Sequence, residues 1–271
     1  MKKLKLFVLF SLLTATFSFG QKTAQDYYNS GNAKDDLQDY RGAIADYTKA
    51  IELTPDDADA YFNRGVAKKS LQDYRGAIAD YSKAIELNPT AAEAYNNRGN
   101  SKSELQDIKG AIADYSKAIE LDPNYVNAYY NRGNSKDDLK DYRGAISDYS
   151  KAIELNPTAA EAYYNRGIAK YNLQDNTGAI SDYTKFIELN PNYSIAYNNR
   201  GNAKKNLQDY RGAIADYNKA IEINPNDADT YYNRGSVKYA LKDLDSACLD
   251  LSKAGELGNA DAYDRIKEFC N

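Results

Sequence analysis

Apolar residues recur along most of the chain with the spacing of amphipathic helices. Within 92–125, one inward-facing stripe follows intervals of three and four residues over 94–105, and a second follows the same intervals over 108–121. Asp107 occupies the position of an N-cap before the second stripe, and Pro123 follows its end. The pattern predicts an antiparallel helix pair with one short turn and a Pro-marked crossover to the next segment.

This pattern is repeated seven times at a fixed period. The glycine of a recurring Asn-Arg-Gly motif returns every 34 residues without a gap, at Gly31, Gly65, Gly99, Gly133, Gly167, Gly201 and Gly235. The units run over 24–57, 58–91, 92–125, 126–159, 160–193, 194–227 and 228–261. Such a period indicates a stacked array in which each unit buries its apolar face against its neighbours. Glycine is unfavourable inside a helix, so seven in register indicate a close backbone approach between the paired helices.

Six positions of each unit carry a resemblance to a known family. In the second unit they are Tyr61, Gly65, Ala77, Tyr81, Ala84 and Pro89, at positions 4, 8, 20, 24, 27 and 32. This pattern resembles the tetratricopeptide repeat (TPR) over all of 24–261. The resemblance implies an all-α fold, a right-handed superhelical α-solenoid of antiparallel helix pairs whose first helices line a concave groove for peptides or protein partners. Residues 262–271 are expected to form a C-terminal capping helix over the end of the array.

The first twenty residues differ in composition from the repeats. A basic start with Lys2, Lys3 and Lys5 precedes an apolar run over 6–17 that is too short to cross a bilayer. Segment 1–20 is therefore predicted to be a signal peptide, cleaved near Gly20. We expect a protein exported to the periplasm, the cell envelope or the exterior, with no membrane insertion after cleavage.

Charge and composition exclude several classes of function. Loss of the three lysines of segment 1–20 changes the net charge from -4 to -7, so neither nucleic acid nor anionic lipid is an expected partner. The chain contains no His, which excludes a Ser-His-Asp triad and imidazole metal ligation. The sequence also has no phosphate-binding loop and no metal-ligand motif. We therefore expect no enzymatic activity, no cofactor and no metal.

An asparagine occupies position 6 of every unit, although asparagine is a poor helix former. The row consists of Asn29, Asn63, Asn97, Asn131, Asn165, Asn199 and Asn233. The TPR resemblance implies that position 6 faces the groove, similar to the asparagine ladder of related superhelical repeats that holds a peptide backbone. An amide offers both donors and an acceptor, so this row is the predicted peptide-binding site. The alternative is that these amides bond to neighbouring helices and stabilise the array.

Aromatic side chains flank this row at position 5. They are Tyr28, Phe62, Tyr130, Tyr164 and Tyr232. Groove aromatics of this kind anchor a peptide or stack on sugar rings, and packing between repeats is an equal alternative. The predicted function is a protein-interaction scaffold or adaptor. Two alternatives stay open, a glycan-binding envelope module that uses these tyrosines and a purely structural or self-assembling array, and the oligomeric state is left open.

Position 7 carries a charge where the TPR family usually has an apolar residue. The series is Arg64, Arg98, Arg132, Arg166, Arg200 and Arg234. An unpaired charge at a helix interface is expensive, and an aspartate at position 23 of every unit is the expected partner. Because the first unit has Ser30 in place of arginine, we expect each arginine to reach the aspartate of the preceding unit, and Arg265 to pair with the remaining Asp250.

Departures from the repeat give structural expectations. Phe186 replaces an alanine of the other units, so the fifth unit is expected to pack with a local irregularity. Thr23, Thr90 and Thr158 each stand three residues before an acidic residue, an arrangement typical of a capping box.

Two cysteines lie near the C-terminal end of the sequence. Cys248 and Cys270 are the only thiols of the chain. An even number of cysteines in an exported protein suggests a disulfide, which would fasten the end of the array.

Overall fold

The computed structural model describes residues 22–270, so the predicted signal peptide lies outside the described residues. Within them the chain is all-α, with fifteen helices and no strand. The helices form two compact units, one that ends at Leu121 and one that begins at Asp122. Each unit is described by itself.

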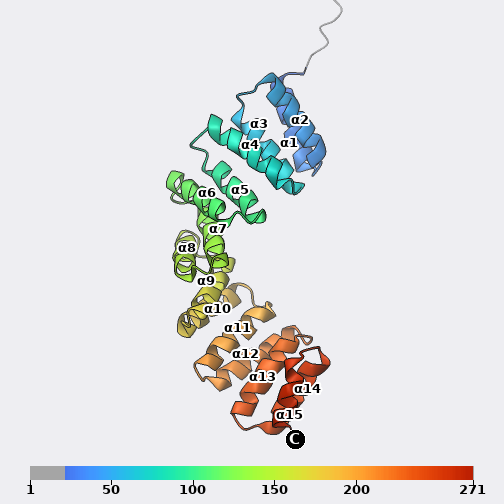
Figure 1. Ribbon diagram of the computed structural model, residues 1–271, viewed down its shortest axis with the longest axis vertical. Coiled ribbons are helices and arrows are strands. Elements are labelled where there is room, and N and C mark those ends of the chain that lie inside the picture. The colour runs from blue at the N-terminus through green and yellow to red at the C-terminus, as the bar shows by residue number, and fades with distance from the viewer. Residues whose placement is uncertain (1–21, 271) are drawn as a thin grey trace, which may run out of the picture. The chain divides into compact units, whose positions relative to one another are not determined.

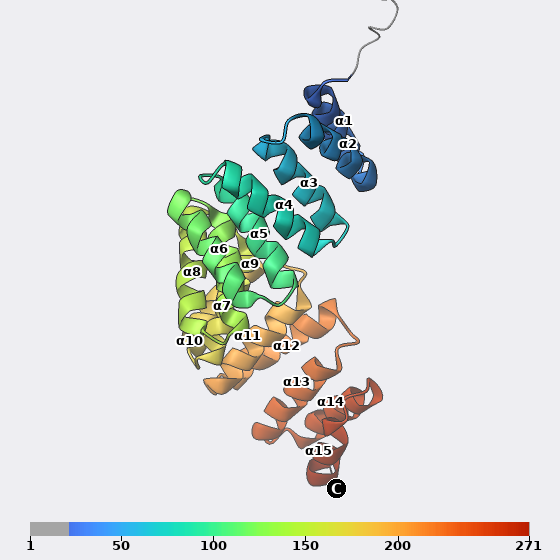
Figure 2. The same ribbon diagram turned by 45° about the horizontal axis from the view of Figure 1, so that its top comes forward.

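The first unit holds three helix pairs, which correspond to the first three repeats. Its helices are α1 (Ala24–Asp36), α2 (Tyr40–Leu53), α3 (Ala58–Ser70), α4 (Tyr74–Leu87), α5 (Ala92–Glu104) and α6 (Ile108–Leu121). The two helices of a pair pack against each other, and the second helix then packs against the first helix of the next pair. Helices adjacent in the chain are thus adjacent in space, as Figures 1 and 2 show.

The second unit continues the same arrangement with four pairs and one additional helix. These are α7 (Val126–Asp138), α8 (Tyr142–Leu155), α9 (Ala160–Asn172), α10 (Asn176–Leu189), α11 (Ser194–Asn206), α12 (Tyr210–Ile223), α13 (Ala228–Ala240), α14 (Leu244–Glu256) and α15 (Asp261–Phe269). Pairs again contact only their neighbours along the chain. The predicted fold class, an all-α array of TPR-type helix pairs, is confirmed.

Side-chain caps mark where the helices begin. Asp107 accepts a hydrogen bond from the backbone N–H of Gly110, as expected for an N-cap. Thr23 forms the predicted capping box with Asp26 at the start of α1. The capping boxes expected from Thr90 and Thr158 are wrong. Helices α5 and α9 begin later, with alanine at the N-cap, and the two threonine hydroxyls donate instead to asparagine side chains of the preceding turn.

The turn inside each pair has a feature that sequence reasoning missed. The residue at position 15 lies in the left-handed region with φ between 60° and 65°, although no unit has glycine there. The seven residues are Gln38, Gln72, Gln106, Lys140, Gln174, Gln208 and Lys242. Their backbone N–H groups bond to carbonyls three residues earlier, which ends the first helix sharply.

The recurring glycine makes room for an aromatic ring. A Cβ atom on Gly133 would lie 2.7 Å from Cε1 of Tyr149, a fully buried side chain of the second helix of the same pair. Six units repeat this contact between positions 8 and 24. The expected close approach is therefore between glycine and a tyrosine ring, not between two backbones. In the seventh unit Leu251 replaces the tyrosine, and Gly235 is less crowded, with its closest contacts at 3.1 Å.

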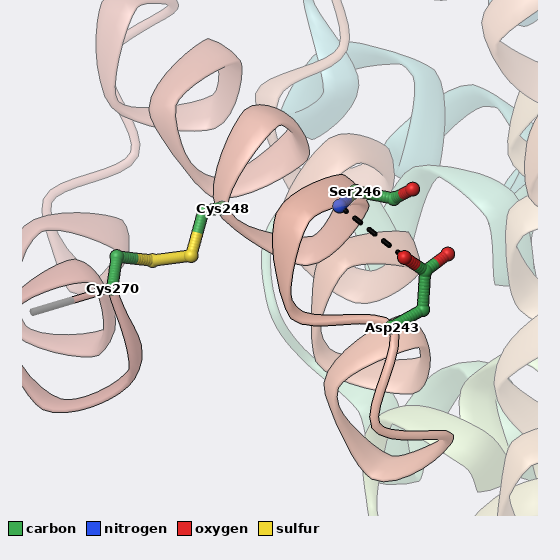
Figure 3. The surroundings of a disulfide bond; sticks show 4 residues. All are labelled: Asp243, Ser246, Cys248 and Cys270. Carbon is green, nitrogen blue, oxygen red and sulfur yellow. Dashed lines mark hydrogen bonds between the residues drawn. A yellow bond between two sulfur atoms is a disulfide. The ribbon is translucent and has the colours of Figure 1, made fainter.

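Helix α15 packs against α14 at the C-terminal end. Ala262 is buried there, and the ring of Phe269 stacks on Tyr239 with 3.5 Å between centroids. Cys248 on α14 and Cys270 directly after α15 are joined by a disulfide (Figure 3). The additional helix at the array end thus begins one residue before the expected position and is held both covalently and by packing.

The fifth unit differs from the others in its side chains. Helix α10 is fourteen residues long, like the second helix of most other pairs, so its length is regular. The difference lies in an aromatic cluster. The ring of Phe186 lies 4.9 Å from that of Tyr164 and 5.3 Å from that of Tyr193, between centroids.

Candidate functional site

The arginine at position 7 forms a two-point ion pair inside its own repeat. Arg166 donates from Nε and Nη2 to the two carboxylate oxygens of Asp182, at 2.9 and 2.6 Å. Each of the other five arginines forms the same pair of bonds with the aspartate that lies sixteen residues later in the chain. The expected pairing with the preceding unit is wrong, because positions 7 and 23 face each other within one helix pair. Lys170 also contacts Asp182, at 2.8 Å, and a lysine at position 11 recurs in this role in every unit.

The contact between repeats comes from the remaining nitrogen of the guanidinium group. Nη1 of Arg166 donates to the hydroxyl of Ser150, at position 25 of the preceding unit, over 2.9 Å. Equivalent bonds from Arg64, Arg98 and Arg200 reach a threonine or serine hydroxyl. The arginine series is thus an internal framework, half-buried between repeats, whose guanidinium groups are engaged in ion pairs.

The two ends of this ionic series also differ from expectation. In the first unit, Ser30 donates to Asp46 and Lys34 pairs with the same carboxylate at 2.6 Å. Asp250 already pairs with Arg234 and a lysine of its own unit. The proposed partner Arg265 instead contacts Glu268 and the hydroxyl of a tyrosine on α13.

The position-6 asparagines use their amide N–H groups to link neighbouring repeats. Asn165 Nδ2 donates to the hydroxyl of Tyr130 and to Oδ1 of Asn134, both at 3.1 Å and both in the preceding repeat. Asn63 makes the same two bonds to Tyr28 and Asn32. Asn199 and Asn233 each donate one such bond, at 3.1 Å. The acceptor for Asn233 is an asparagine that stands in place of the aromatic residue at position 5 of the preceding repeat.

The side-chain carbonyl oxygens of this row differ in whether they accept a hydrogen bond. Oδ1 of Asn97 accepts from Lys69 at 3.2 Å, and Oδ1 of Asn29 accepts from Gln25. Asn131 is also partnered. Within residues 22–270 no hydrogen bond reaches the Oδ1 atoms of the remaining four side chains, all half-buried, which are Asn63, Asn165, Asn199 and Asn233.

Sequence reasoning missed a second asparagine, at position 9. Oδ1 of Asn134 accepts from the buried hydroxyl of Tyr149 at 2.8 Å in addition to the bond from Asn165. The same bond from tyrosine occurs in three other units, at Asn32, Asn100 and Asn202. The signal was present, because these units pair an asparagine at position 9 with a tyrosine fifteen residues later. Where Val66 stands at position 9, the hydroxyl of Tyr81 is buried without a partner among the described residues.

Four of the five position-5 aromatic rings pack on the core tyrosines of their own repeats. Tyr130 lies 6.0 Å from Tyr149 between ring centroids, and the other tilted pairs lie at 5.7 to 6.0 Å. Burial and the neighbouring Tyr193 raise the pKa of Tyr164 to about 12. The hydroxyl of Tyr232 accepts from Arg265 at 3.4 Å. These side chains are half-buried parts of the repeat framework as well as candidate contact residues.

Three cavities adjoin the two candidate rows. One of about 410 Å³ is lined by Val126, Tyr130, Ala152 and Ala159 of the fourth repeat together with Ala162 of the fifth. A smaller equivalent of about 110 Å³ lies at the same positions of the second and third repeats.

The third cavity, of about 230 Å³, is polar and acidic. Asn134, Asp137, Asp138 and Asn165 line it with Tyr149 at its wall. One carboxylate oxygen of Asp137 is buried and has no hydrogen-bond partner in the part of the chain that the structure describes. Burial, assisted by the charge of Asp138, raises the pKa of Asp137 above its ordinary value.

Residues 22–270 offer neither a cluster of metal ligands nor a helix suited to span a membrane. They contain no group of three His, Cys, Asp or Glu side chains placed to hold a metal ion. None of their helices combines the length and the apolar character needed to cross a bilayer.

Comparisons with solved structures give the same architecture. YrrB, described as a TPR protein with an unusual peptide-binding site, is 28% identical, with a TM-score of 0.63 over 72% of this chain and 97% of YrrB. MamA is 27% identical, with a TM-score of 0.59 over 64% of this chain and 94% of MamA. The C-terminal part of a TPR repeat-containing protein from Cytophaga hutchinsonii, 21% identical, reaches a TM-score of 0.76 over 88% and 98% and supports the fold alone.

Family comparisons identify the repeats themselves. A model described as TPR repeat matches 31–72, 102–136 and 138–174. Models described as tetratricopeptide repeat match 58–91, 160–193, 194–227 and 216–248. A comparison with curated proteins gave no match. The chain belongs to the tetratricopeptide repeat family.

Proposed function

We propose that this protein is a non-catalytic interaction scaffold that binds an extended segment of a partner protein along its position-6 asparagines. The TPR fold and the similarity to YrrB, whose description names a peptide-binding site, support a protein partner. The absence of histidine from the sequence supports a non-catalytic role.

One observation carries this proposal. In Asn63, Asn165, Asn199 and Asn233 the amide nitrogen is held by the preceding repeat, while Oδ1 accepts no bond from the described residues. The held nitrogen fixes the direction of the carbonyl, so each side chain offers a preorganised acceptor. A peptide N–H satisfies such an acceptor whatever side chain it carries.

The spacing of the repeats suits an extended ligand. Packed helices lie about 8 to 10 Å apart, and an extended chain rises about 3.3 Å per residue. Asn165, Asn199 and Asn233 belong to consecutive repeats of the second unit. They would accept from roughly every third N–H group of a bound segment.

The test uses a peptide from the partner that crosslinks to the protein in its host. We expect N-methylation of single backbone nitrogens to weaken binding at positions about three residues apart and to have little effect between them. Uniform losses along the peptide would contradict recognition by a row of acceptors.

A matched pair of variants separates binding from support of the fold. Asn165→Ala removes both the acceptor and the inter-repeat bonds, whereas Tyr130→Phe removes one of those bonds and leaves the acceptor in place. We expect the first variant to weaken peptide binding about tenfold more than the second, as for one lost hydrogen bond. Equal loss of thermal stability with unchanged binding in both variants would instead support a purely structural array.

We also propose that the scaffold acts after export, as the basic and apolar segment 1–20 suggests. The Cys248–Cys270 disulfide supports this, because such bonds persist in oxidising compartments. N-terminal sequencing of the protein purified from its host should give Gln21 as the first residue. A chain that begins at Met1 in the cytosolic fraction would contradict export.

A further inference from the structure

We propose that the junction of the fourth and fifth repeats selects an aromatic side chain of the ligand and, next to it, a lysine or arginine side chain. This inference rests on the proposed peptide binding and specifies which residues the peptide carries. Two cavities of different character support it, one lined by Tyr130 and the other lined by Asn165.

The larger cavity has the form of an aromatic site whose ring is missing. In the fifth repeat, the positions equivalent to Ala152 and Ala159 carry Phe186 and Tyr193. Their rings lie 4.9 and 5.6 Å from the ring of Tyr164, between centroids.

The fifth repeat is therefore an internal example of the occupied site. Tyr164 corresponds to Tyr130, which lines the cavity of about 410 Å³ in the fourth repeat. With alanine at both other positions, the fourth repeat leaves open the space that two aromatic rings fill one repeat later. An aromatic side chain of a ligand fits there against Tyr130.

The smaller cavity has the chemistry of a site for a cation. Asp137 and Asp138 supply two carboxylates, and the buried Oδ1 of Asp137 has no partner among the described residues. Leaving a buried acceptor unsatisfied is unfavourable, and an ammonium or guanidinium group would satisfy it.

The second repeat again shows the occupied form. Its residue at the position of Asp137 is Lys69, and the ammonium group donates to Oδ1 of Asn97 at 3.2 Å. Asn97 is the equivalent of Asn165. A cationic group beside this asparagine is thus part of the protein's own structure where position 12 is lysine, and must come from a ligand where position 12 is aspartate.

Asn165 links one lining residue of each cavity. Its amide nitrogen lies 3.1 Å from Oη of Tyr130, a residue that lines the first cavity, and 3.1 Å from Oδ1 of Asn134, a residue that lines the second. These two acceptors are therefore no farther apart than twice that distance. Side chains on one face of an extended peptide repeat every two residues, about 6.5 Å. The expected ligand motif is an aromatic residue and a basic residue separated by one residue.

The energetics of Asp137 agree with a role in binding. Burial raises the pKa of this carboxyl, so its ionised form is disfavoured in the free protein. A structural carboxylate is instead paired, as Asp182 is with Arg166 and Lys170. Asp137→Asn should therefore raise the melting temperature while it weakens binding of a basic peptide, a combination that a structural role does not produce.

The experiment uses the full, disulfide-bonded chain and a positional-scanning library of acetylated, amidated octapeptides. The pools that fix Phe or Tyr, and Lys or Arg two residues away, should bind most strongly in fluorescence anisotropy. The best defined peptide is then titrated against variants.

Variants copied from other repeats close each cavity with a side-chain combination that the array already accommodates. Ala152→Phe with Ala159→Tyr reproduces the fifth repeat and should weaken binding of the aromatic peptide about tenfold or more. Asp137→Lys reproduces the second repeat and should weaken binding of the basic peptide by a similar factor. Glu154→Lys makes the same charge change on the exposed side of α8, where Lys151 pairs with Glu154, and should leave binding unchanged.

The outcomes separate the two proposals. Library pools that bind without preference for aromatic and basic residues, or binding that survives both substitutions, would overturn this inference and leave peptide binding intact. If no pool bound at all, the proposed peptide-binding function would fail first and this inference with it. Equal weakening by Glu154→Lys would show a general charge effect and would also overturn the cation site.

Discussion

At the scale of single residues, the array depends on how position 8 and position 24 share space. Gly133 lies under the ring of Tyr149 and has no room for a methyl group. The tyrosine hydroxyl donates a hydrogen bond to Oδ1 of Asn134, and the same oxygen accepts a second bond from the amide of Asn165 in the next repeat. One glycine thus permits a chain of contacts that begins in the core and ends at the candidate peptide-binding row.

Replacing this glycine should destabilise the protein in spite of helix propensity. Alanine is favoured over glycine in a helix by about 1 kcal/mol, but Gly133→Ala places Cβ 2.7 Å from the ring of Tyr149, and overpacking costs about 1 to 3 kcal/mol. We expect a net loss of up to about 2 kcal/mol in urea denaturation. Gly235→Ala is the control and should lose less, because its Cβ would lie 3.1 Å from Leu251 and from the backbone carbonyl of Ala247 and would meet no ring. A larger loss at Gly235 would contradict the role of the ring.

The buried carboxylate at position 23 should be the most sensitive charged site. Asp182→Asn leaves Arg166 and Lys170 without their anion at a site only 3% exposed. Breaking a buried ion pair in this way costs about 3 to 5 kcal/mol. The exposed pair of Glu188 with Lys185 provides the control, since Glu188→Gln should cost less than about 1 kcal/mol. Similar shifts of the unfolding midpoint for both variants would argue against the ionic framework.

At the scale of elements, a cap and a turn determine where the two helices of each pair begin and end. An aspartate caps the second helix of every pair for which the cap is described, and the turn before it contains a residue with positive φ. Left-handed backbone costs a non-glycine residue about 1 to 2 kcal/mol. The turn is therefore held in place by the packing of the two helices rather than by its own residue type.

A glycine at this turn should stabilise the pair. Gln106 has φ of 63°, and its side chain makes no hydrogen bond among the described contacts. Gln106→Gly should gain about 0.5 to 1 kcal/mol, after the entropic cost of glycine is subtracted. The reverse change at Gly258, where φ is 101° and a Cβ would meet nothing within 4 Å, isolates backbone strain. Gly258→Ala should lose stability in the same thermal unfolding assay, and a gain there would contradict the argument.

At the scale of the whole molecule, the repeats within each unit pack only on their neighbours along the chain, so the first and last repeats differ from the rest. The first repeat lacks the position-7 arginine and keeps Asp46 paired through Lys34. The last repeat is followed by α15 and the disulfide. Loss of order is therefore expected to begin at an end.

Reduction of the disulfide should release the C-terminal end. The two cysteines are 22 residues apart in sequence, and closing such a loop contributes about 3 kcal/mol. Limited proteolysis after reduction should cut within α15 while the preceding helices remain protected. The Cys248→Ser, Cys270→Ser double variant should be cut equally with and without reductant. Equal resistance of the oxidised and reduced wild-type protein would show that packing of Phe269 on Tyr239 suffices.

Much of this architecture was predictable from the sequence because it depends on local periodicity. The 34-residue period and the stripes of apolar residues determined the number of repeats and the class of fold. The position-6 asparagines could be identified as a row for the same reason. The arginine–aspartate attraction was also predictable, because a buried charge requires a partner.

Only the tertiary structure decided which groups are paired and which are free. Sequence spacing could not tell whether Arg166 meets the aspartate of its own repeat or that of the preceding repeat, because the two lie at similar distances along the chain, 16 and 18 residues away. Nor could it show that the amide N–H groups of Asn165 donate to Tyr130 and Asn134, while its side-chain carbonyl oxygen accepts no bond from the described residues. Periodicity specifies positions along a helix, whereas hydrogen bonds and cavities depend on distances between helices, and those are known only once the helices are packed.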